Sequence, residues 1–293
     1  MTLAENTYLD SGLYLIGTGV GSSSNMSVGG QRAAAGCEYR FLEGYTSLLD
    51  DGENNQLEEL VGVFSVIRRP EVESPEIILD LAKKTSVALM IVGDPLQATT
   101  HVDLLLRCKD EGIRTEVHHA VSIIDLVCAG VGLKSYKFGR QVTIPFPYAG
   151  HLPTSPLEMI ADNLHLGLHT LVLLDLDPTG AGIDAPSPMN PNQAIAILSE
   201  MVKRVEEDPP PHLNDELEKS LKMQLRKVAI SEIISTGVGE KLGVLCSNMG
   251  SSKQKVSFGT LNQLSELEIE GIHSLVVLGS LSGLEEEALK RLH

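Results

Sequence analysis

Short apolar runs of strand length alternate with helix-like segments through the first half of the chain. The runs at 13–17 and 87–92 are almost wholly apolar, and each one meets a glycine at its end. Shorter strand-like runs lie at 38–42, 61–67 and 115–117. Segments with helical spacing lie between them, at 27–37, 75–85, 101–112 and 122–130. Continuous apolar strands separated by helices are typical of a mainly parallel sheet, so we expect an α/β unit here.

The same alternation starts again in the second half of the chain. Helical spacing is found at 157–166 and 192–206, and apolar strands are found at 170–176, 241–246 and 274–278. Between the two halves, the segment 136–147 contains a glycine and two prolines, which interrupt regular structure. We therefore expect two α/β domains, at 13–140 and 141–293, after an N-terminal leader at 1–12.

The charge balance changes the picture of possible partners. The chain has 293 residues, with 23 Lys and Arg against 39 Asp and Glu, which gives a formal net charge of −16. Direct binding to nucleic-acid phosphates normally needs a basic face, so we expect no direct nucleic-acid partner. Aromatic residues make up 4% of the chain and Trp is absent, which also disfavours stacking platforms for bases.

The sequence contains no pattern for membrane insertion or secretion. No apolar run approaches the roughly 18–20 residues of a membrane span. The first eleven residues contain Glu5 and Asp10 but no Lys or Arg, unlike a secretory signal. The cysteines are too far apart for a C-x-x-C pair, so we expect reduced and mostly buried thiols in a cytoplasmic protein: Cys37, Cys108, Cys128 and Cys246.

A glycine-rich turn follows the first strand. Its pattern, Gly17-x-Gly19-x-Gly21, is close to a dinucleotide-binding fingerprint, but Ser22 occupies the position of the third glycine. The polar residues after it also delay the next helix, so no helix N-terminus faces a pyrophosphate at once. This spacing disfavours a nicotinamide cofactor. Two interpretations stay open: the turn lines a ligand, or it only bends the chain sharply.

A second candidate lies at the end of the apolar run 87–92. Asp94 follows Gly93 at the carboxyl end of that strand, where ligands of open α/β sheets gather. Its carboxylate can accept hydrogen bonds from a ribose or an amino group, or it can simply form an Asx turn before Pro95. His165 and His169 have the spacing of one helix face, but no H-E-x-x-H glutamate accompanies them, so we expect no metal site. Neither a G-x-S-x-G elbow nor a Ser-His-Asp order is found, so no catalytic residue is assigned.

A set of ordered motifs identifies a family resemblance. The residues that carry it are Leu13-Tyr14-Leu15-Ile16-Gly17-x-Gly19, Glu43-x-Tyr45-Thr46-Ser47, Val92-Gly93-Asp94-Pro95-x-x-Ala98-Thr99-Thr100-His101, Tyr136-Lys137-Phe138-Gly139, Gly167-x-His169-Thr170-Leu171 with Leu174-Asp175, Asn192-Gln193-Ala194 and His273-Ser274-Leu275. Each motif alone is weak, but in this order they resemble the diphthine synthase family. The resemblance covers nearly the whole chain from Leu13 onward.

The resemblance implies a fold, a cofactor and an activity. Such proteins are similar to the tetrapyrrole methylases (class III methyltransferases) and have two α/β domains with S-adenosyl-L-methionine in the cleft between them; the product is S-adenosyl-L-homocysteine. They are usually homodimers, and they methylate the modified histidine of translation elongation factor 2 in diphthamide biosynthesis. The implied cofactor contacts are Val20, Asp94, Gln97, Ser122, Ile123, Leu174, Met249 and His273. Gln97 stands where relatives usually have glycine.

Two other functions are compatible with parts of the sequence. A tetrapyrrole methylase of the same fold would act on a small macrocycle, and a dinucleotide-dependent oxidoreductase would use the turn at 17–19. The motifs at 43–47 and 98–101 favour the protein-modifying methyltransferase. On that interpretation the acidic charge suits a cationic substrate and a basic region of elongation factor 2, with no direct nucleic-acid or membrane partner.

Overall fold

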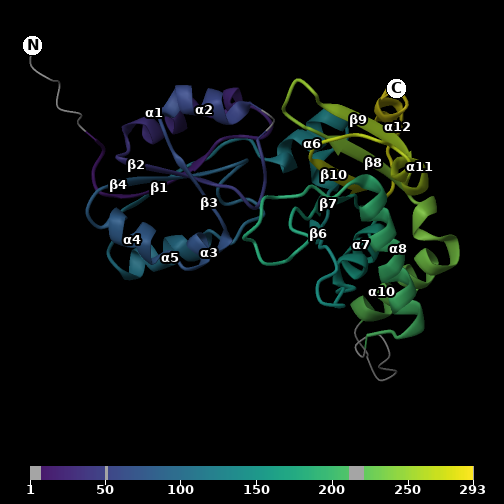
Figure 1. The fold of residues 1–293 in the computed structure, drawn as a ribbon. Coiled ribbons are helices and arrows are strands. Elements are labelled where there is room, and N and C mark those ends of the chain that lie inside the picture. Colours follow the sequence, from purple (N-terminus) through teal and green to yellow (C-terminus); the bar gives the residue numbers. More distant parts are fainter. Residues whose placement is uncertain (1–7, 50–51, 211–220, 293) are drawn as a thin grey trace, which may run out of the picture. The chain divides into compact units, whose positions relative to one another are not determined.

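The first sheet consists of five parallel strands in the order β3-β2-β4-β1-β5 (Figure 1). The strands are β1 (Gly12–Gly17), β2 (Tyr39–Glu43), β3 (Ser65–Ile67), β4 (Ser86–Ile91) and β5 (Thr115–His118). β1 and β4 are buried along their whole length and pair in register, with Leu15 opposite Leu89. Apolar runs without polar alternation are the pattern of strands covered on both faces, and these two strands occupy such positions. The computed structural model describes residues 8–49, 52–210 and 221–292.

Helices cover both faces of this sheet. On one face lie α1 (Val28–Gly36) and α2 (Glu53–Val61), after the short turn η1 (Ser23–Asn25). On the other face lie α3 (Arg69–Glu73), α4 (Glu76–Ala82) and α5 (Val102–Asp110). Even-numbered β1 residues such as Tyr14 pack towards α1, and odd-numbered residues such as Leu15 pack towards α4 and α5. The alternation of a strand thus divides the first unit into two separate apolar clusters.

The second sheet is mixed, with the order β6-β7-β10-β8-β9. Its strands are β6 (Val142–Ile144), β7 (Thr170–Leu174), β8 (Leu242–Ser247), β9 (Lys255–Thr260) and β10 (His273–Val277). β6 and β7 are parallel, whereas β10 is antiparallel to both β7 and β8, and β9 is antiparallel to β8. Antiparallel pairs need no helical crossover, which is why β8 and β9 follow each other closely in the chain.

Helices and short 3-10 turns complete the second unit. They are α6 (Ile123–Val131), η2 (Ser135–Lys137), α7 (Ser155–His165), α8 (Pro191–Glu207), α10 (Leu221–Thr236), η3 (Val238–Glu240), α11 (Leu261–Ser265) and α12 (Gly283–Leu289). The apolar sides of α7, α8 and α10 share one core with the buried residues of the sheet. A full capping box at Asn190 and Gln193 starts α8, since each side chain satisfies the backbone N–H of the other residue.

The chain divides into two compact units. The first reaches Ile123 and also includes Ala181–Pro186 and Gly250–Ser252; the second contains the remaining parts of the chain. The domain limit expected at residue 140 lies within the second unit, because α6 groups with that unit. Of the expected leader, residues 1–7 lie outside the described residues, and β1 begins at Gly12.

The structure differs from the elements expected from the sequence in one strand that is shorter and in two strands that are additional. The strand expected at 61–67 is only β3, at 65–67, since α2 extends to Val61. The buried residues of α2 are Leu57 and Val61. β6 and β9 were not expected, and both are short or half-exposed. The four cysteines are all free and buried, as expected. Among the described residues, none of the helices is long and apolar enough to cross a membrane.

Candidate active site

Two glycine turns are joined at the carboxyl edge of the first sheet. Gly19 follows β1 and Gly93 follows β4, and their backbones exchange hydrogen bonds of 3.2 and 2.8 Å. Both residues have positive φ, 74° and 86°, a conformation that costs glycine little and other residues more. A Cβ atom on Gly17 would lie 2.5 Å from the carbonyl oxygen of Gly93. The glycines thus let two neighbouring strand ends approach closely, and Val20 follows directly after this junction.

Asp94 lies at the centre of this edge. Its side chain is 6% exposed. Oδ1 accepts a hydrogen bond from the backbone N–H of Leu96 at 3.0 Å, and Oδ2 accepts one from Ala120 at 3.3 Å. Oδ2 also lies 2.8 Å from Nδ1 of His119. Because Ala120 and His119 follow β5, this one carboxylate connects the loop after β4 with the loop after β5 across the end of β1.

The other predicted cofactor contacts of the first unit lie on the same edge. Gln97 is exposed, and its backbone N–H bonds to the carbonyl of Asp94 at 3.3 Å, in the loop after β4. Ser122 is buried and Ile123 is half-buried, and both follow β5 where α6 begins. β4, β1 and β5 are neighbours in the sheet. The topology therefore brings residues of three separate sequence segments to one edge, where ligands of open α/β sheets bind.

The predicted contacts of the second unit also share an edge of their sheet. Leu174 ends β7, His273 begins the antiparallel β10, and Met249 comes shortly after the end of β8. All three side chains are buried. Nδ1 of His273 lies 2.8 Å from Oγ of Ser247, which is its partner in the β8–β10 register. Burial lowers the pKa of His273, so its ring is held neutral.

His119 belongs to the carboxyl edge of the first sheet, and it is not among the residues predicted from the sequence. The adjacent pair His118-His119 shows no signal beyond the alternation of a strand. In the structure the two rings do different things: Nε2 of His118 lies 3.0 Å from Oε1 of Glu116, while His119 meets Asp94. The imidazole of His119 is 67% exposed although its partner is buried. His119 is assigned to the site only because the structure brings the loop after β5 against the loop after β4.

A buried pair behind the same edge accounts for two of the family motifs. Glu43 ends β2, and its carboxylate accepts hydrogen bonds from the backbone of Tyr45 (3.1 Å) and from the backbone and hydroxyl of Thr46 (2.6 and 2.7 Å). Nε2 of His101 lies 3.7 Å from this carboxylate, and Nδ1 lies 3.2 Å from the carbonyl of Pro95. Burial lowers the pKa of His101. The pair therefore links the loop of Asp94 to the end of β2.

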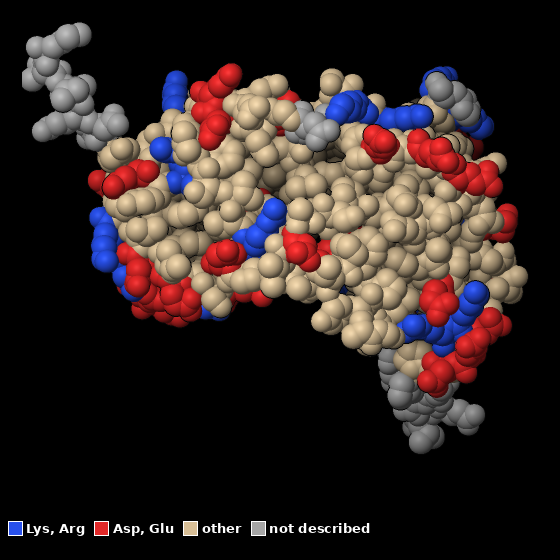
Figure 2. Space-filling model, in the orientation of Figure 1, with Lys and Arg blue, Asp and Glu red and all other residues tan. Residues whose placement is uncertain are grey.

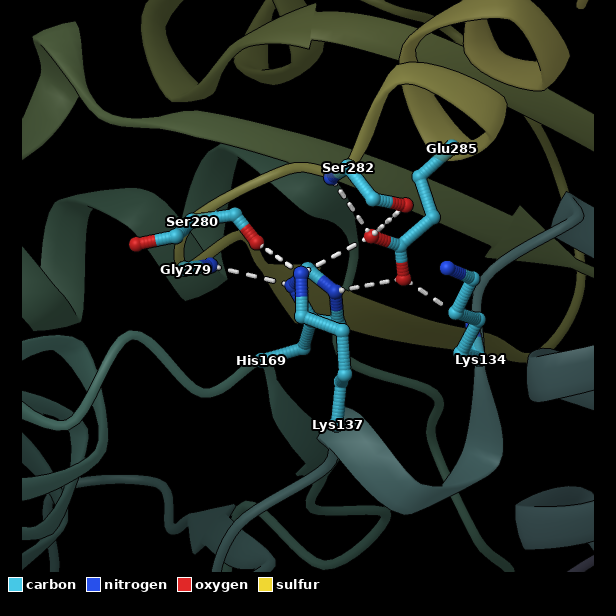
Figure 3. A network of polar contacts seen from close by, with 7 residues as sticks. All are labelled: Lys134, Lys137, His169, Gly279, Ser280, Ser282 and Glu285. Carbon is cyan, nitrogen blue, oxygen red and sulfur yellow. Dashed lines mark hydrogen bonds and ion pairs between the residues drawn. The ribbon is translucent and has the colours of Figure 1, made fainter.

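A second network accounts for the motifs of the second unit. Figure 3 shows Glu285, from α12, among groups of the segments 134–137, 169 and 279–282. Its Oε1 accepts from the backbone of Lys134 (3.1 Å) and lies 3.2 Å from Nε2 of His169; its Oε2 accepts from Nζ of Lys137 at 2.8 Å. Nδ1 of His169 accepts from the backbone N–H of Gly279 at 3.0 Å, so Nε2 must be the donor to Glu285. Lys137 and His169 thus have a structural role in joining segments of the unit.

The paired histidines 165 and 169 do not share a helix face. α7 ends at His165, and His169 lies beyond Gly167, whose φ is 70°. His169 is wholly buried and bonded to Glu285. In the described part of the chain, no group of three or more His, Cys, Asp or Glu side chains has an arrangement that could hold a metal ion.

The delayed helix after the glycine turn is confirmed. α1 begins only at Val28, capped by Ser27, whose hydroxyl accepts from the backbone of Gly30 at 3.0 Å. In the segment between the glycine turn and α1, the backbone N–H and the hydroxyl of Ser23 donate to the carboxylate of Glu53, at 2.6 and 2.8 Å. The turn therefore lacks the arrangement in which a helix N-terminus binds a dinucleotide pyrophosphate.

Comparisons with known proteins agree with this architecture. Residues 12–210 match the family of Tetrapyrrole (Corrin/Porphyrin) Methylases. The diphthine methyl ester synthase of Yarrowia lipolytica is 32% identical over 92% of this chain and 84% of its own length. The diphthine synthase of Methanothermobacter thermautotrophicus is 41% identical over 56% of this chain, and the match spans 63% of that protein. A crystal structure of diphthine synthase superposes with a TM-score of 0.75 at 26% identity, over 96% of this chain and 95% of that one.

Proposed function

Because this chain belongs to the diphthine synthase family of the tetrapyrrole methylases, and is thus a methyltransferase of diphthamide biosynthesis, we propose that it methylates the modified histidine of translation elongation factor 2. The methyl donor in this proposal is S-adenosyl-L-methionine. The observation that carries the proposal is the carboxyl edge of β4, β1 and β5, where Asp94 joins two loops beside a glycine junction.

The residues of this edge fit a nucleoside with a charged amino-acid tail. A Cβ atom at Gly93 would meet only Val20 within 4 Å, at 3.7 Å, so the backbone there is open to a ligand, whereas Asn25 fills the space beside Gly19. Asp94 presents a buried carboxylate, the group that best accepts hydrogen bonds from ribose hydroxyls or an ammonium group. In this proposal the residues that contact the cofactor are Val20, Asp94, Gln97, Ser122, Ile123, Leu174, Met249 and His273.

The chemistry that the cofactor supplies is a methyl group on a positively charged sulfur. The task of the protein is to hold the acceptor nitrogen in line with that methyl group, since positioning alone can lower the barrier by about 7–11 kcal/mol. The edge is well suited to this task because its loops are bonded to one another. Asp94, in the loop after β4, bonds to the loop after β5, and His101 connects the loop after β4 to Glu43 at the end of β2.

The acidic surface supports a basic protein substrate. In Figure 2, Asp and Glu side chains lie over α4 and α5 of the first unit, but Asp80 pairs with Lys83 and Asp103 pairs with Arg107 there. The support therefore comes from the net charge of the whole chain, −16. A negative field speeds encounter with a positively charged partner and favours a cationic substrate group. The substrate amine is cationic when protonated, and each added methyl group brings it closer to a permanent positive charge. We also propose that the enzyme is a cytoplasmic homodimer, which light scattering in solution would test.

Mass spectrometry of elongation factor 2 tests the proposal directly. The factor, carrying the incompletely modified histidine, is incubated with the enzyme and S-adenosyl-L-methionine. We expect mass increments of one methyl group on that histidine, and their number gives the stoichiometry. An elongation factor 2 in which that histidine is replaced by glutamine is the matched control and should gain no mass. An unchanged mass of the modified factor would overturn the proposed substrate.

A thermal-shift experiment tests the cofactor independently of the substrate. A ligand that binds the native state raises the melting temperature, by an amount that grows with its concentration relative to its Kd. We expect S-adenosyl-L-homocysteine to raise the Tm, and NAD at the same concentration to leave it unchanged. Stabilisation by NAD alone would overturn the proposed cofactor.

A further inference from the structure

We propose that His119 is the general base that removes a proton from the acceptor amine, with Asp94 holding its ring in place. This inference rests on the proposed function, because it names the residue that makes the attacking nitrogen neutral. It goes beyond the family resemblance, from which no catalytic residue was assigned.

The first observation is the asymmetry of the pair. Nδ1 of His119 lies 2.8 Å from Oδ2 of Asp94, whose carboxylate is 6% exposed, whereas the imidazole itself is 67% exposed. A carboxylate accepts but does not donate, so Nδ1 carries the hydrogen of the neutral ring. Nε2 is then the basic nitrogen, and it has no hydrogen-bond partner among the described residues. A buried carboxylate that orients an exposed imidazole is the arrangement that enzymes use for proton removal.

The second observation is the place of the pair in the fold. His119 follows the end of β5, three residues before Ser122, and Asp94 follows the end of β4. The glycine junction at the end of β1 lies between these two strands in the sheet. The exposed ring therefore lies on the edge that we propose for the methyl donor. An acceptor amine positioned for in-line attack must come to that edge.

The third observation is that Asp94 is held by several bonds and cannot easily leave the ring. Its Oδ1 is occupied by the N–H of Leu96 and its Oδ2 also accepts from the N–H of Ala120. Ala120 is the residue next to His119, so the same carboxylate fixes both the backbone and the ring. A ring fixed in this way loses little entropy when it accepts a proton from a bound substrate.

The proposed step conserves protons and electrons. One proton moves from the ammonium group of the substrate to Nε2 of His119. The nitrogen lone pair that is freed forms the new N–C bond to the methyl group. The bond between that methyl group and the donor sulfur breaks, and its electron pair stays on sulfur as a neutral thioether. The imidazolium then returns the proton to solvent, and the cycle can repeat for each further methyl group.

The charged and titratable groups around His119 leave its Nε2 without a partner among the described residues. Asp94 is the group in direct contact, and it meets Nδ1 of the ring. Glu43 and His101 lie behind the loop after β4, where His101 contacts the carbonyl of Pro95. Glu116 and His118, on β5, form a contact of their own at 3.0 Å. Among these groups, only His119 combines exposure with a free ring nitrogen.

A pair of amide variants separates catalysis from positioning. His119→Asn keeps an N–H near the position of Nδ1 and so retains the bond to Asp94, but it lacks the basic Nε2. His119→Gln places an amide nearer the position of Nε2. A matched control is His165→Asn, which removes an exposed histidine at the end of α7. All variants are studied in the full-length protein with elongation factor 2 as substrate.

We expect His119→Asn to bind S-adenosyl-L-homocysteine within about twofold of wild type by calorimetry, because Asp94 keeps its partner. Its kcat at pH 7 should fall by about 100-fold, within the range found for loss of a general base. The deficit should shrink as the pH rises from 7 to 10, where the amine loses its proton without help, and added imidazole should restore part of the rate.

Other outcomes would overturn the inference. A kcat within twofold of wild type at pH 7, or a deficit that is the same at every pH and insensitive to imidazole, would show that His119 has at most a positioning role. A wild-type enzyme that fails to methylate elongation factor 2 would instead contradict the proposed function. The two failures are therefore distinguished by the wild-type arm of the same experiment.

Discussion

Nε2 of His169 lies 3.2 Å from Oε1 of Glu285, and both side chains are wholly buried although 116 positions separate them in the chain (Figure 3). The carboxylate also holds Lys137, Lys134 and Ser282. Burial opposes ionisation of Glu285, but the hydrogen bonds from Lys137, Ser282 and Lys134 outweigh it and hold its pKa well below the usual value. The network thus links α12 to the middle of the chain by one ionised carboxylate.

Replacing that carboxylate should destabilise the second unit. In Glu285→Gln, the ammonium of Lys137 loses its charge partner in a site where the carboxylate has no contact with solvent. Removing one partner of a buried ion pair costs about 3–5 kcal/mol. We expect a clearly lower urea concentration at the midpoint of unfolding, with unfolding monitored by circular dichroism. Glu286→Gln, on the exposed side of α12, is the control and should leave the midpoint unchanged. Equal midpoints for the two variants would contradict this role.

Three buried histidines should make the protein less stable in mild acid. Burial lowers the pKa of His101, His169 and His273 below the usual value of about 6.5 for histidine. As the pH falls through that value, the unfolded chain takes up protons that the folded protein does not, so stability is full above it and decreases below it. We expect a lower Tm at pH 5.5 than at pH 7.5. His101→Gln should reduce this pH difference, and an identical Tm at both pH values would contradict the prediction.

An alanine at Gly17 should destabilise the glycine junction. In Gly17→Ala the new Cβ atom would lie 2.5 Å from the carbonyl oxygen of Gly93 and 2.8 Å from Cβ of Ala120. Overpacking of this kind typically costs about 1–3 kcal/mol, and here it would also separate the loops after β1 and β4. We expect a lower Tm and weaker binding of S-adenosyl-L-homocysteine. Gly283→Ala meets no atom within 4 Å and should behave as wild type in both measurements.

Loss of the Asp94 carboxylate should weaken cofactor binding. Hydrogen bonds to charged groups contribute about 1.5–3 kcal/mol, which corresponds to a tenfold or greater change in Kd. We expect Asp94→Ala to keep the circular dichroism spectrum of wild type and to raise the Kd of S-adenosyl-L-homocysteine by at least tenfold in calorimetric titration. Asp103→Ala, an exposed acid on α5, is the control. An unchanged Kd for Asp94→Ala would remove this residue from the cofactor site.

Salt should slow the reaction with the protein substrate. Attraction between an acidic enzyme of net charge −16 and a basic partner is screened over about 8–10 Å at 0.1–0.15 M ionic strength. We expect kcat/KM for elongation factor 2 to fall several-fold between 50 and 300 mM KCl, while kcat at saturating substrate stays nearly constant. A kcat/KM that does not respond to salt would contradict the role of the acidic surface.

The sequence by itself determined the elements with strong local patterns. The apolar runs of β1 and β4 could be located because a strand buried on both faces is continuously apolar. The helix α1 could be located because its alanine run favours a helix and Gly36 favours its end. The turn after β1 was recognised from its glycines, and the family from its ordered motifs. α2 and β9 were missed because only Leu57 and Val61 of α2 are buried and because β9 is half-exposed, so neither has a strong apolar signature.

Only the tertiary structure decided which polar side chains meet. Asp94 was selected from its place after a strand, but its partner His119 lies 25 positions further on and has no local signature. The same holds for Glu43 with His101 and for His169 with Glu285. Glu43, His101 and His169 belong to the family motifs, but the sequence does not show which side chains they contact. Local periodicity specifies which face of an element is buried. Which ends of different strands lie side by side is set by the strand order β3-β2-β4-β1-β5, and that order is a property of the whole packed unit.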